Sequence, residues 1–318
     1  MLSGVERVRS RKVHMDRRTF SKSIAGLAFG AASLDRANTA AAAQETQGAA
    51  QGVPFDLSVM LWTVFRKLPF EQRLEKIAEA GYKKVELVGE YKDWSADDFK
   101  RANAKRKELG ITFDTTAGLK HAVGNPKERE ALLSDLRDVL PIMEKIECPA
   151  VIIMSGNVVP GMPRDVQHDS CIEGLKAASA LVEGKKINGE PVRLLLENID
   201  PEENPRYYLT SVAEGFEVMR QVNHPQVRML YDFYHEQIAE GNLIEKLETN
   251  IDYVGLVHIA DVPGRHAPGT GEINYKNIFR KLAELKYNRI AAMEFLPVGD
   301  AVEELRSARE FAIRSART

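Results

Sequence analysis

The chain has 318 residues and is close to charge balance, with 44 Lys and Arg against 46 Asp and Glu and a formal net charge of −2. Apolar residues make up 44 % of the sequence, which is enough for a full hydrophobic core and excludes a globally disordered protein. The near-neutral balance argues against a nucleic-acid-binding protein, and no apolar run reaches the roughly 18 residues that a membrane-spanning helix needs.

The N-terminal segment has the features of a twin-arginine export signal. The motif DRRTFSK at 16–22 precedes an apolar run at 24–34 that is rich in Ala and Gly, and small residues follow at 40–43. We therefore expect a signal at 1–43 that directs the protein to the periplasm or out of the cell, a linker at 44–54, and a folded domain at 55–318. The alternative is a cytosolic chain with a disordered N-terminal segment. Translation can start at Met1 or Met15, because the signal is complete from either residue.

From residue 57 onward, the pattern alternates buried strands with amphipathic helices. The predicted strands are 57–61, 84–88, 111–116, 151–154, 192–196, 227–231, 253–259 and 290–293. The predicted helices are 69–80, 96–109 with Ser95 as its cap, 127–146, 171–183, 211–222, 243–247, 275–285 and a final helix from about 300. This alternation favours parallel strands with right-handed crossovers, closed into a single (β/α)8 TIM barrel. A doubly wound open sheet is the alternative, but no glycine-rich phosphate turn follows the first strand.

Cys148 and Cys171 lie on either side of the fourth predicted strand and its exit loop. A strand of about five residues separates its two ends by roughly 16 Å. A disulfide requires Cα atoms within about 7 Å of each other. We therefore expect two free thiols, even in an exported protein.

Four consecutive predicted strands end in ionisable side chains, namely Glu197, Asp232, His258 and Glu294. The carboxyl ends of barrel strands meet at one mouth, so these side chains are expected to converge there. Three carboxylates and one imidazole favour one divalent ion, Mn²⁺ or Mg²⁺, with Co²⁺ and Zn²⁺ also acceptable. Taken singly, each carboxylate is more typical of a helix cap or an ion pair, and His258 of a satisfied core histidine. The prediction of a metal site depends on the coincidence of all four.

The loop after the seventh strand carries further candidates. Arg265 is predicted to hold a substrate oxygen, because a guanidinium can bind such groups with two hydrogen bonds. His266 and Glu272 are expected either to support the loop or to contact the substrate. The weaker candidates are aromatic residues that wall the pocket or pack in the core, and one lone histidine: Trp62, Phe65 and His121.

Several segments resemble the hydroxypyruvate isomerase family: SVMLWTVF at 58–65, PFEQR at 69–73, AGY at 80–82 with VEL at 85–87, and VPGRHAPGTGEINY at 262–275. That family belongs to the xylose isomerase-like barrels, together with sugar isomerases, ketose 3-epimerases, inosose dehydratases and endonuclease IV. The resemblance extends from about Leu57 to the last residue. It implies that Glu197, Asp232, His258 and Glu294 bind the metal and that Glu197 and Glu294 form the acid/base pair. It also implies that His235 and Arg265 contact the substrate.

The chain departs from two members of this group. Hydroxypyruvate isomerases usually have Gln at the position of His258, whereas His is typical of the ketose epimerase branch. The metal site should survive this change, but the substrate assignment is weakened. Endonuclease IV has an Asp at the position of Gly264, so its three-metal cluster would lack a ligand here. Together with the absence of a basic excess, this argues against a role on DNA.

We therefore expect a divalent-metal-dependent isomerase or epimerase of a small hydroxy-carbonyl or sugar substrate, which acts by proton transfer through a metal-stabilised enediolate. The alternative is a metal-dependent lyase or dehydratase that acts on a keto-sugar or keto-glycoside. The export signal slightly favours the lyase, because hydroxypyruvate is a cytosolic metabolite. A non-catalytic sugar-binding protein would be expected to lose a ligand, and none is missing. The expected partner is a small-molecule substrate, without nucleic acid or stable membrane insertion, and a homo-oligomer remains open.

Overall fold

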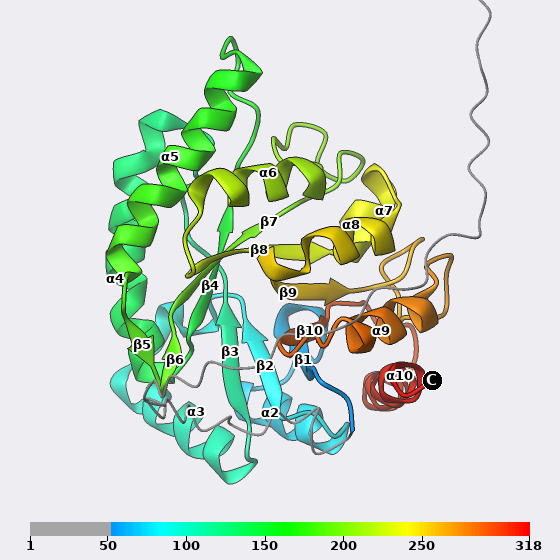
Figure 1. Cartoon of the computed structure of the whole chain (residues 1–318). Coiled ribbons are helices and arrows are strands. Elements are labelled where there is room, and N and C mark those ends of the chain that lie inside the picture. Colours follow the sequence, from blue (N-terminus) through cyan, green and yellow to red (C-terminus); the bar gives the residue numbers. More distant parts are fainter. Residues whose placement is uncertain (1–51) are drawn as a thin grey trace, which may run out of the picture. The chain divides into compact units, whose positions relative to one another are not determined.

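The computed structural model describes residues 52–318, which form a closed barrel of parallel strands surrounded by helices (Figure 1). The strand order around the barrel is β1–β10–β9–β8–β7–β4–β3–β2, so the first and last strands pair and close it. The barrel strands are β1 Asp56–Met60, β2 Lys84–Leu87, β3 Thr112–Thr116, β4 Ala150–Met154, β7 Arg193–Glu197, β8 Val227–Asp232, β9 Val254–Ile259 and β10 Ile290–Met293. This architecture confirms the predicted (β/α)8 TIM barrel and rules out the open sheet.

The helices pack their apolar faces on the outside of the barrel. They are α2 Phe70–Glu79, α3 Ala96–Glu108, α4 Arg129–Ile146, α5 Arg164–Val182, α6 Val212–Val222, α7 Phe233–Ala239, α8 Leu243–Asn250, α9 Tyr275–Glu284 and α10 Ala301–Ala316. Local signals explain where they begin. Ser95 caps α3 as predicted, because its hydroxyl accepts from the Asp98 amide while the Asp98 carboxylate accepts from the Ser95 amide.

The inside of the barrel is apolar at its middle and charged at both ends. Alternate residues of each strand face inward. On β7 this alternation aligns Arg193, Leu195 and Glu197 along the interior, and β8 repeats it with Arg228, Leu230 and Asp232. Leu195 and Leu230 belong to the buried apolar cluster that fills the barrel. On β7 and β8, the acidic residues therefore lie at the carboxyl ends of the strands and the basic residues at the amino ends.

Three elements differ from the predictions. Helix α5 begins at Arg164 rather than Cys171, so the loop after β4 is shorter than expected. Helix α7 follows β8 directly, because the Asp232 carboxylate accepts from the amides of Tyr234 and His235 and so caps it. A two-stranded hairpin, β5 Lys186–Ile187 and β6 Glu190–Pro191, was not predicted.

Cys148 and Cys171 are both buried free thiols, as predicted. No helix in residues 52–318 combines the length and apolar character needed to cross a membrane. The predicted export signal at 1–43 and most of the predicted linker lie outside the described residues.

Candidate active site

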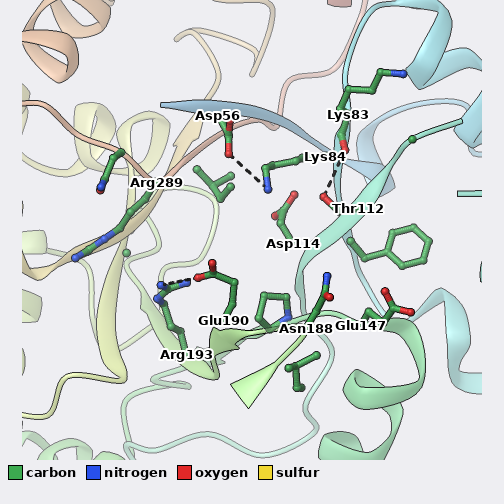
Figure 2. Close-up of a pocket in the computed structure, with 17 residues that line it drawn as sticks. Asp56, Lys83, Lys84, Thr112, Asp114, Glu147, Asn188, Glu190, Arg193 and Arg289 are labelled. Atoms are coloured by element: carbon green, nitrogen blue, oxygen red, sulfur yellow. Dashed lines mark hydrogen bonds and ion pairs between the residues drawn. The ribbon is translucent and has the colours of Figure 1, made fainter. Parts of the chain in front are cut away.

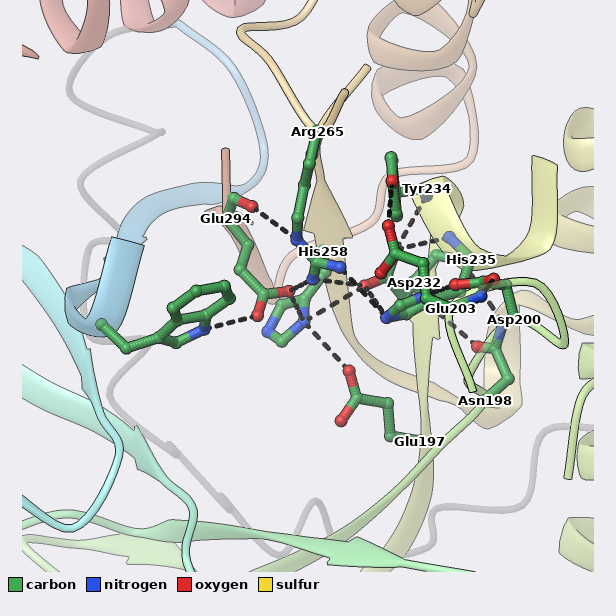
Figure 3. A network of polar contacts seen from close by, with 12 residues as sticks. Glu197, Asn198, Asp200, Glu203, Asp232, Tyr234, His235, His258, Arg265 and Glu294 are labelled. Atoms are coloured by element: carbon green, nitrogen blue, oxygen red, sulfur yellow. Dashed lines mark hydrogen bonds and ion pairs between the residues drawn. The ribbon is translucent and has the colours of Figure 1, made fainter. Parts of the chain in front are cut away.

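The four predicted ligands converge at the carboxyl end of the barrel (Figure 3). Glu197 and Asp232 end β7 and β8, His258 lies near the end of β9, and Glu294 follows β10 directly. One ligand atom from each side chain lies within 4.8 Å of the others, and all four residues are buried. The barrel thus brings together residues that are up to 97 positions apart, from 197 to 294.

His258 lies at the centre of this cluster. Its Nδ1 atom is 2.7 Å from Glu294 Oε2, 3.4 Å from Glu197 Oε1 and 3.7 Å from Asp232 Oδ2. Among the described residues, neither His258 Nδ1 nor Glu294 Oε2 has a hydrogen bond of acceptable geometry, although the two atoms are so close. Buried nitrogen and oxygen atoms that converge without hydrogen bonds to one another are suited to bind a cation between them.

The charges of the cluster also suit a divalent cation. Three carboxylates outnumber the single guanidinium of Arg265, so the site has a net negative charge when the imidazole is neutral, as metal binding requires. Burial lowers the pKa of His258, but the charges of Glu294 and Glu86 outweigh burial and raise that pKa well above its usual value. The surrounding field therefore favours positive charge at this position, and the oxygen-rich ligand set fits Mn²⁺ or Mg²⁺.

Arg265 covers the cluster from the loop after β9. Its Nη2 atom lies 2.6 Å from Glu294 Oε2 and 3.4 Å from Asp232 Oδ2, and its Nε atom donates to the Glu294 carbonyl. The guanidinium also lies over the rings of Trp62 and Tyr234. Burial alone would raise the pKa of Glu294, but Arg265 and His258 lower it to about 2. Glu294 is therefore ionised at neutral pH.

The loop that carries Arg265 is organised by one buried carboxylate. Asp261 accepts hydrogen bonds from the backbone amides of Val262, Gly269, Gly271 and Ile273. A Cβ atom on Gly271 would lie 2.1 Å from the Val262 carbonyl oxygen, so only glycine fits this close approach. The loop therefore has a defined conformation that places Arg265 over the site.

His235 and Trp62 extend the site beyond the four ligands. His235 Nδ1 lies 2.6 Å from Asp200 Oδ2, and His235 Nε2 lies 3.2 Å from Arg265 Nη1. The Trp62 indole donates from Nε1 to Glu294 Oε1 at 2.8 Å, so this aromatic residue does wall the site. His235 therefore borders the ligand cluster through Arg265, and Trp62 borders it through Glu294.

Glu86 is a site residue that sequence reasoning missed. It is fully buried inside β2, and its Oε2 atom lies 3.0 Å from His258 Nε2, across the barrel interior. This contact keeps Nε2 occupied and leaves Nδ1 of His258 for the cluster. Burial raises the pKa of Glu86 to about 7, although His258 partly opposes this rise. An acidic residue within a predicted strand was the signal that could have revealed it.

Four other candidates make their described contacts elsewhere. His266 Nδ1 lies 3.0 Å from the Leu296 carbonyl oxygen, and exposed Glu272 accepts from Gln237. These contacts are those of loop support, and the substrate-binding role of His266 and Glu272 stays a prediction. His121 pairs with Asp135 at 3.0 Å in an outer loop. Phe65 packs against the hydrophobic core.

Comparison with known proteins places the chain among characterised barrels. A family model described as xylose isomerase-like TIM barrel matches residues 74–312. Over 250 residues, the chain is 32 % identical to the 2-oxo-tetronate isomerase of Haemophilus influenzae, and the match covers 77 % of this chain and 95 % of that protein. It is 28 % identical over 246 residues to the hydroxypyruvate isomerase of Escherichia coli K12, with 76 % and 93 % covered. A solved structure of the IolI protein with a bound zinc atom is similar in fold, with a TM-score of 0.69, 18 % identity, and 82 % and 98 % covered.

Proposed function

The chain belongs to the xylose isomerase-like TIM barrel family as an isomerase-type enzyme, and from this premise we propose that it is a divalent-metal-dependent isomerase or epimerase of a small hydroxy-carbonyl or sugar substrate. The observation that carries the proposal is the convergence of four buried ligand atoms within 4.8 Å at one barrel mouth. The two isomerase relatives support the reaction class, and the zinc bound to the IolI protein supports a metal in a barrel of this fold.

In this proposal Glu197, Asp232, His258 and Glu294 hold the cation. When bound, the cation supplies Lewis-acid stabilisation of the negative charge that develops on the substrate's carbonyl oxygen. The ligand set favours Mn²⁺ or Mg²⁺, and it also accepts Co²⁺ or Zn²⁺.

The side chains supply the proton transfers. One of the carboxylates Glu197 and Glu294 removes a proton from the carbon next to the carbonyl, and the other returns a proton to the adjacent carbon or to the opposite face. Trp62 fixes the orientation of Glu294 through its indole N–H. Arg265 and His235 hold substrate oxygens, and the buried setting of all these groups excludes water from the intermediate.

Solvent deuterium uptake, followed by NMR, tests this proposal. Metal-loaded protein is incubated in D₂O with hydroxypyruvate, 2-oxo-tetronate, ketoses and 3-keto-glycosides. Deuterium next to the carbonyl together with a new isomer establishes the isomerase or epimerase class and identifies the substrate. Products of water loss or a released fragment would replace it with the lyase or dehydratase. Chelator treatment should abolish the uptake and Mn²⁺ should restore it, and uptake that persists without metal contradicts the cation's role.

We also propose that the protein is exported through the twin-arginine pathway. The motif at 16–22 and the apolar run after it support this location. Replacement of Arg17 and Arg18 by Lys should retain the protein in the cytoplasm, as measured by cell fractionation. Export that is unchanged by this replacement would refute the proposal.

A further inference from the structure

A second polar cavity lies at the amino-terminal ends of the barrel strands, opposite the candidate active site (Figure 2). We call it the basal pocket. The residues that matter for its chemistry are Asp56, Lys84, Asp114, Glu190, Arg193 and Arg289. Its volume is about 400 Å³, which is within the range of small-molecule sites. The hairpin β5–β6 contributes part of the wall through Glu190.

One side of the basal pocket carries more positive charge than the protein neutralises. Arg193 pairs with Glu190 at 3.3 Å, and no carboxylate of residues 52–318 lies within ion-pair distance of Arg228 or Arg289. Arg289 donates to the Val254 carbonyl, and neighbouring Arg228 donates to two backbone carbonyls. Burial lowers the pKa of Arg228, and the charges of Arg289 and Arg193 lower it further. These guanidiniums therefore repel one another and favour an anion between them.

Gly255 lets the side chain of Arg228 pack closely against the backbone of β9. It lies at the start of β9, the strand between β8 and β10, and it lines the basal pocket. A Cβ atom at this position would lie 2.6 Å from Arg228 Cβ and 2.6 Å from Leu195 Cδ2. Neither distance is compatible with a Cβ atom, so only glycine lets the Arg228 and Leu195 side chains approach β9 this closely, beside the basal pocket.

The other side of the basal pocket is acidic. Asp114 is buried, and its Oδ2 atom accepts from the Ser58 hydroxyl at 2.6 Å. Its Oδ1 atom has no hydrogen-bond partner within residues 52–318. Lys84 lies beside it and is 3.5 Å from Asp56 (Figure 2). A buried carboxylate with an unused acceptor suits a ligand that brings hydroxyl donors, directly or through water.

We propose that the basal pocket binds a small polar metabolite that carries an oxyanion, either phosphate or carboxylate, on Arg193 and Arg289. Hydroxyl groups of the same ligand lie toward Asp114. Guanidinium groups bind both kinds of oxyanion with paired hydrogen bonds, and the pocket volume accommodates an anion with a short carbon chain. This site is separate from the proposed reaction, because its residues lie at the opposite ends of the strands.

Isothermal titration of the full chain with inorganic phosphate, and separately with malonate, tests the proposal at low ionic strength. The stronger of the two identifies the kind of oxyanion. Arg193→Gln should weaken binding about five- to tenfold, as expected for one charge-assisted contact in a half-exposed site. Glu190→Gln should strengthen binding, because it frees Arg193 from its carboxylate partner. Far-UV circular dichroism of each variant confirms that the fold is kept.

Two further variants separate the basal pocket from other binding. Arg265→Gln removes the guanidinium of the candidate active site, so binding that survives this change does not come from that mouth. Arg220→Gln removes an exposed arginine of α6 that contacts Asn250, and it should leave binding unchanged. Absence of saturable binding to either anion overturns the proposal, as does binding that Arg193→Gln and Glu190→Gln both leave unaltered.

Discussion

Glu86 and His258 contact each other across the barrel interior, with Glu86 Oε2 at 3.0 Å from His258 Nε2. Glu86→Gln keeps the volume of the side chain but removes its charge. We expect it to weaken Mn²⁺ binding by about 10- to 100-fold, the usual effect of losing a carboxylate that orients a metal-bound histidine. Chelator competition measures the affinity. Asp114→Asn is the matched control, because Asp114 is another buried carboxylate but accepts a hydrogen bond from Ser58 rather than contacting one of the four cluster residues. Equal affinity in both variants would contradict the role of Glu86.

Glu294→Gln should leave the protein folded and lower turnover by at least about 100-fold, because it removes one member of the acid/base pair. The rate of solvent deuterium uptake measures this effect. Glu272→Gln changes an exposed glutamate of the loop after β9 and should retain most of the activity. If Glu272→Gln causes the larger loss, the predicted substrate contact of Glu272 is correct and its assignment to loop support is wrong.

Trp62→Phe should lower kcat about tenfold, because it removes the N–H donor to Glu294 while an aromatic ring remains in the wall. The chain has two tryptophans, which provides a natural control. Trp94 packs edge-on against Phe70 and Phe99, away from the cluster. Trp94→Phe should therefore leave kcat unchanged. A similar decrease in both variants would indicate a general loss of packing instead.

Asp114 should destabilise the folded chain as the pH rises. Burial raises its pKa from 3.8 to about 6, so the folded state holds this proton more tightly than the unfolded state. The stability associated with the protonated form is therefore lost between about pH 4 and pH 6, at a cost of about 3 kcal/mol. The free energy of unfolding of Asp114→Asn, relative to that of wild type, should be higher at pH 7.5 than at pH 4 by this amount. Urea unfolding at the two pH values measures it.

Asp135→Asn is the control of opposite sign for this pH effect. Burial alone would raise the pKa of Asp135, but hydrogen bonds from His121 and nearby amides lower it. Its carboxylate therefore stabilises the folded state above the unfolded pKa, and this stability is lost as the pH falls. Relative to wild type, Asp135→Asn should be less stable at pH 7.5 than at pH 4. Identical pH profiles for the Asp114 and Asp135 variants would refute both assignments.

The sequence was sufficient to predict the barrel and the convergence of Glu197, Asp232, His258 and Glu294, because both follow from periodicity and from where strands end. Glu86 could not be assigned in the same way. Its partner His258 is distant in sequence. The two side chains meet only because the pairing registers of β2 and β9 place them at the same level inside the barrel.

The remaining errors were local. Helix α7 was missed because Asp232 is both the last residue of β8 and the cap of the next helix, so no loop separates them. The hairpin β5–β6 was missed although Asn188 and Gly189 form a pair that is typical of tight hairpin turns. The predicted start of α5, Cys171, lies seven residues after the observed start at Arg164 because the first turns of the helix are polar. Gln167 is nevertheless buried there, since it forms hydrogen bonds with the loop before the helix.

The pairing of β1 with β10 joins the two ends of the sheet, and Glu86 and His258 belong to strands on opposite sides of this seam. An occupant of the ligand cluster would bind only a barrel whose seam is shut, so it would oppose local opening along the seam. The backbone amides of Leu57, Ser58 and Val59, which belong to the strand at the seam, should then exchange with solvent more slowly when the cluster is filled. The chemistry at the mouth of the barrel and the closure of the barrel are in this sense a single equilibrium.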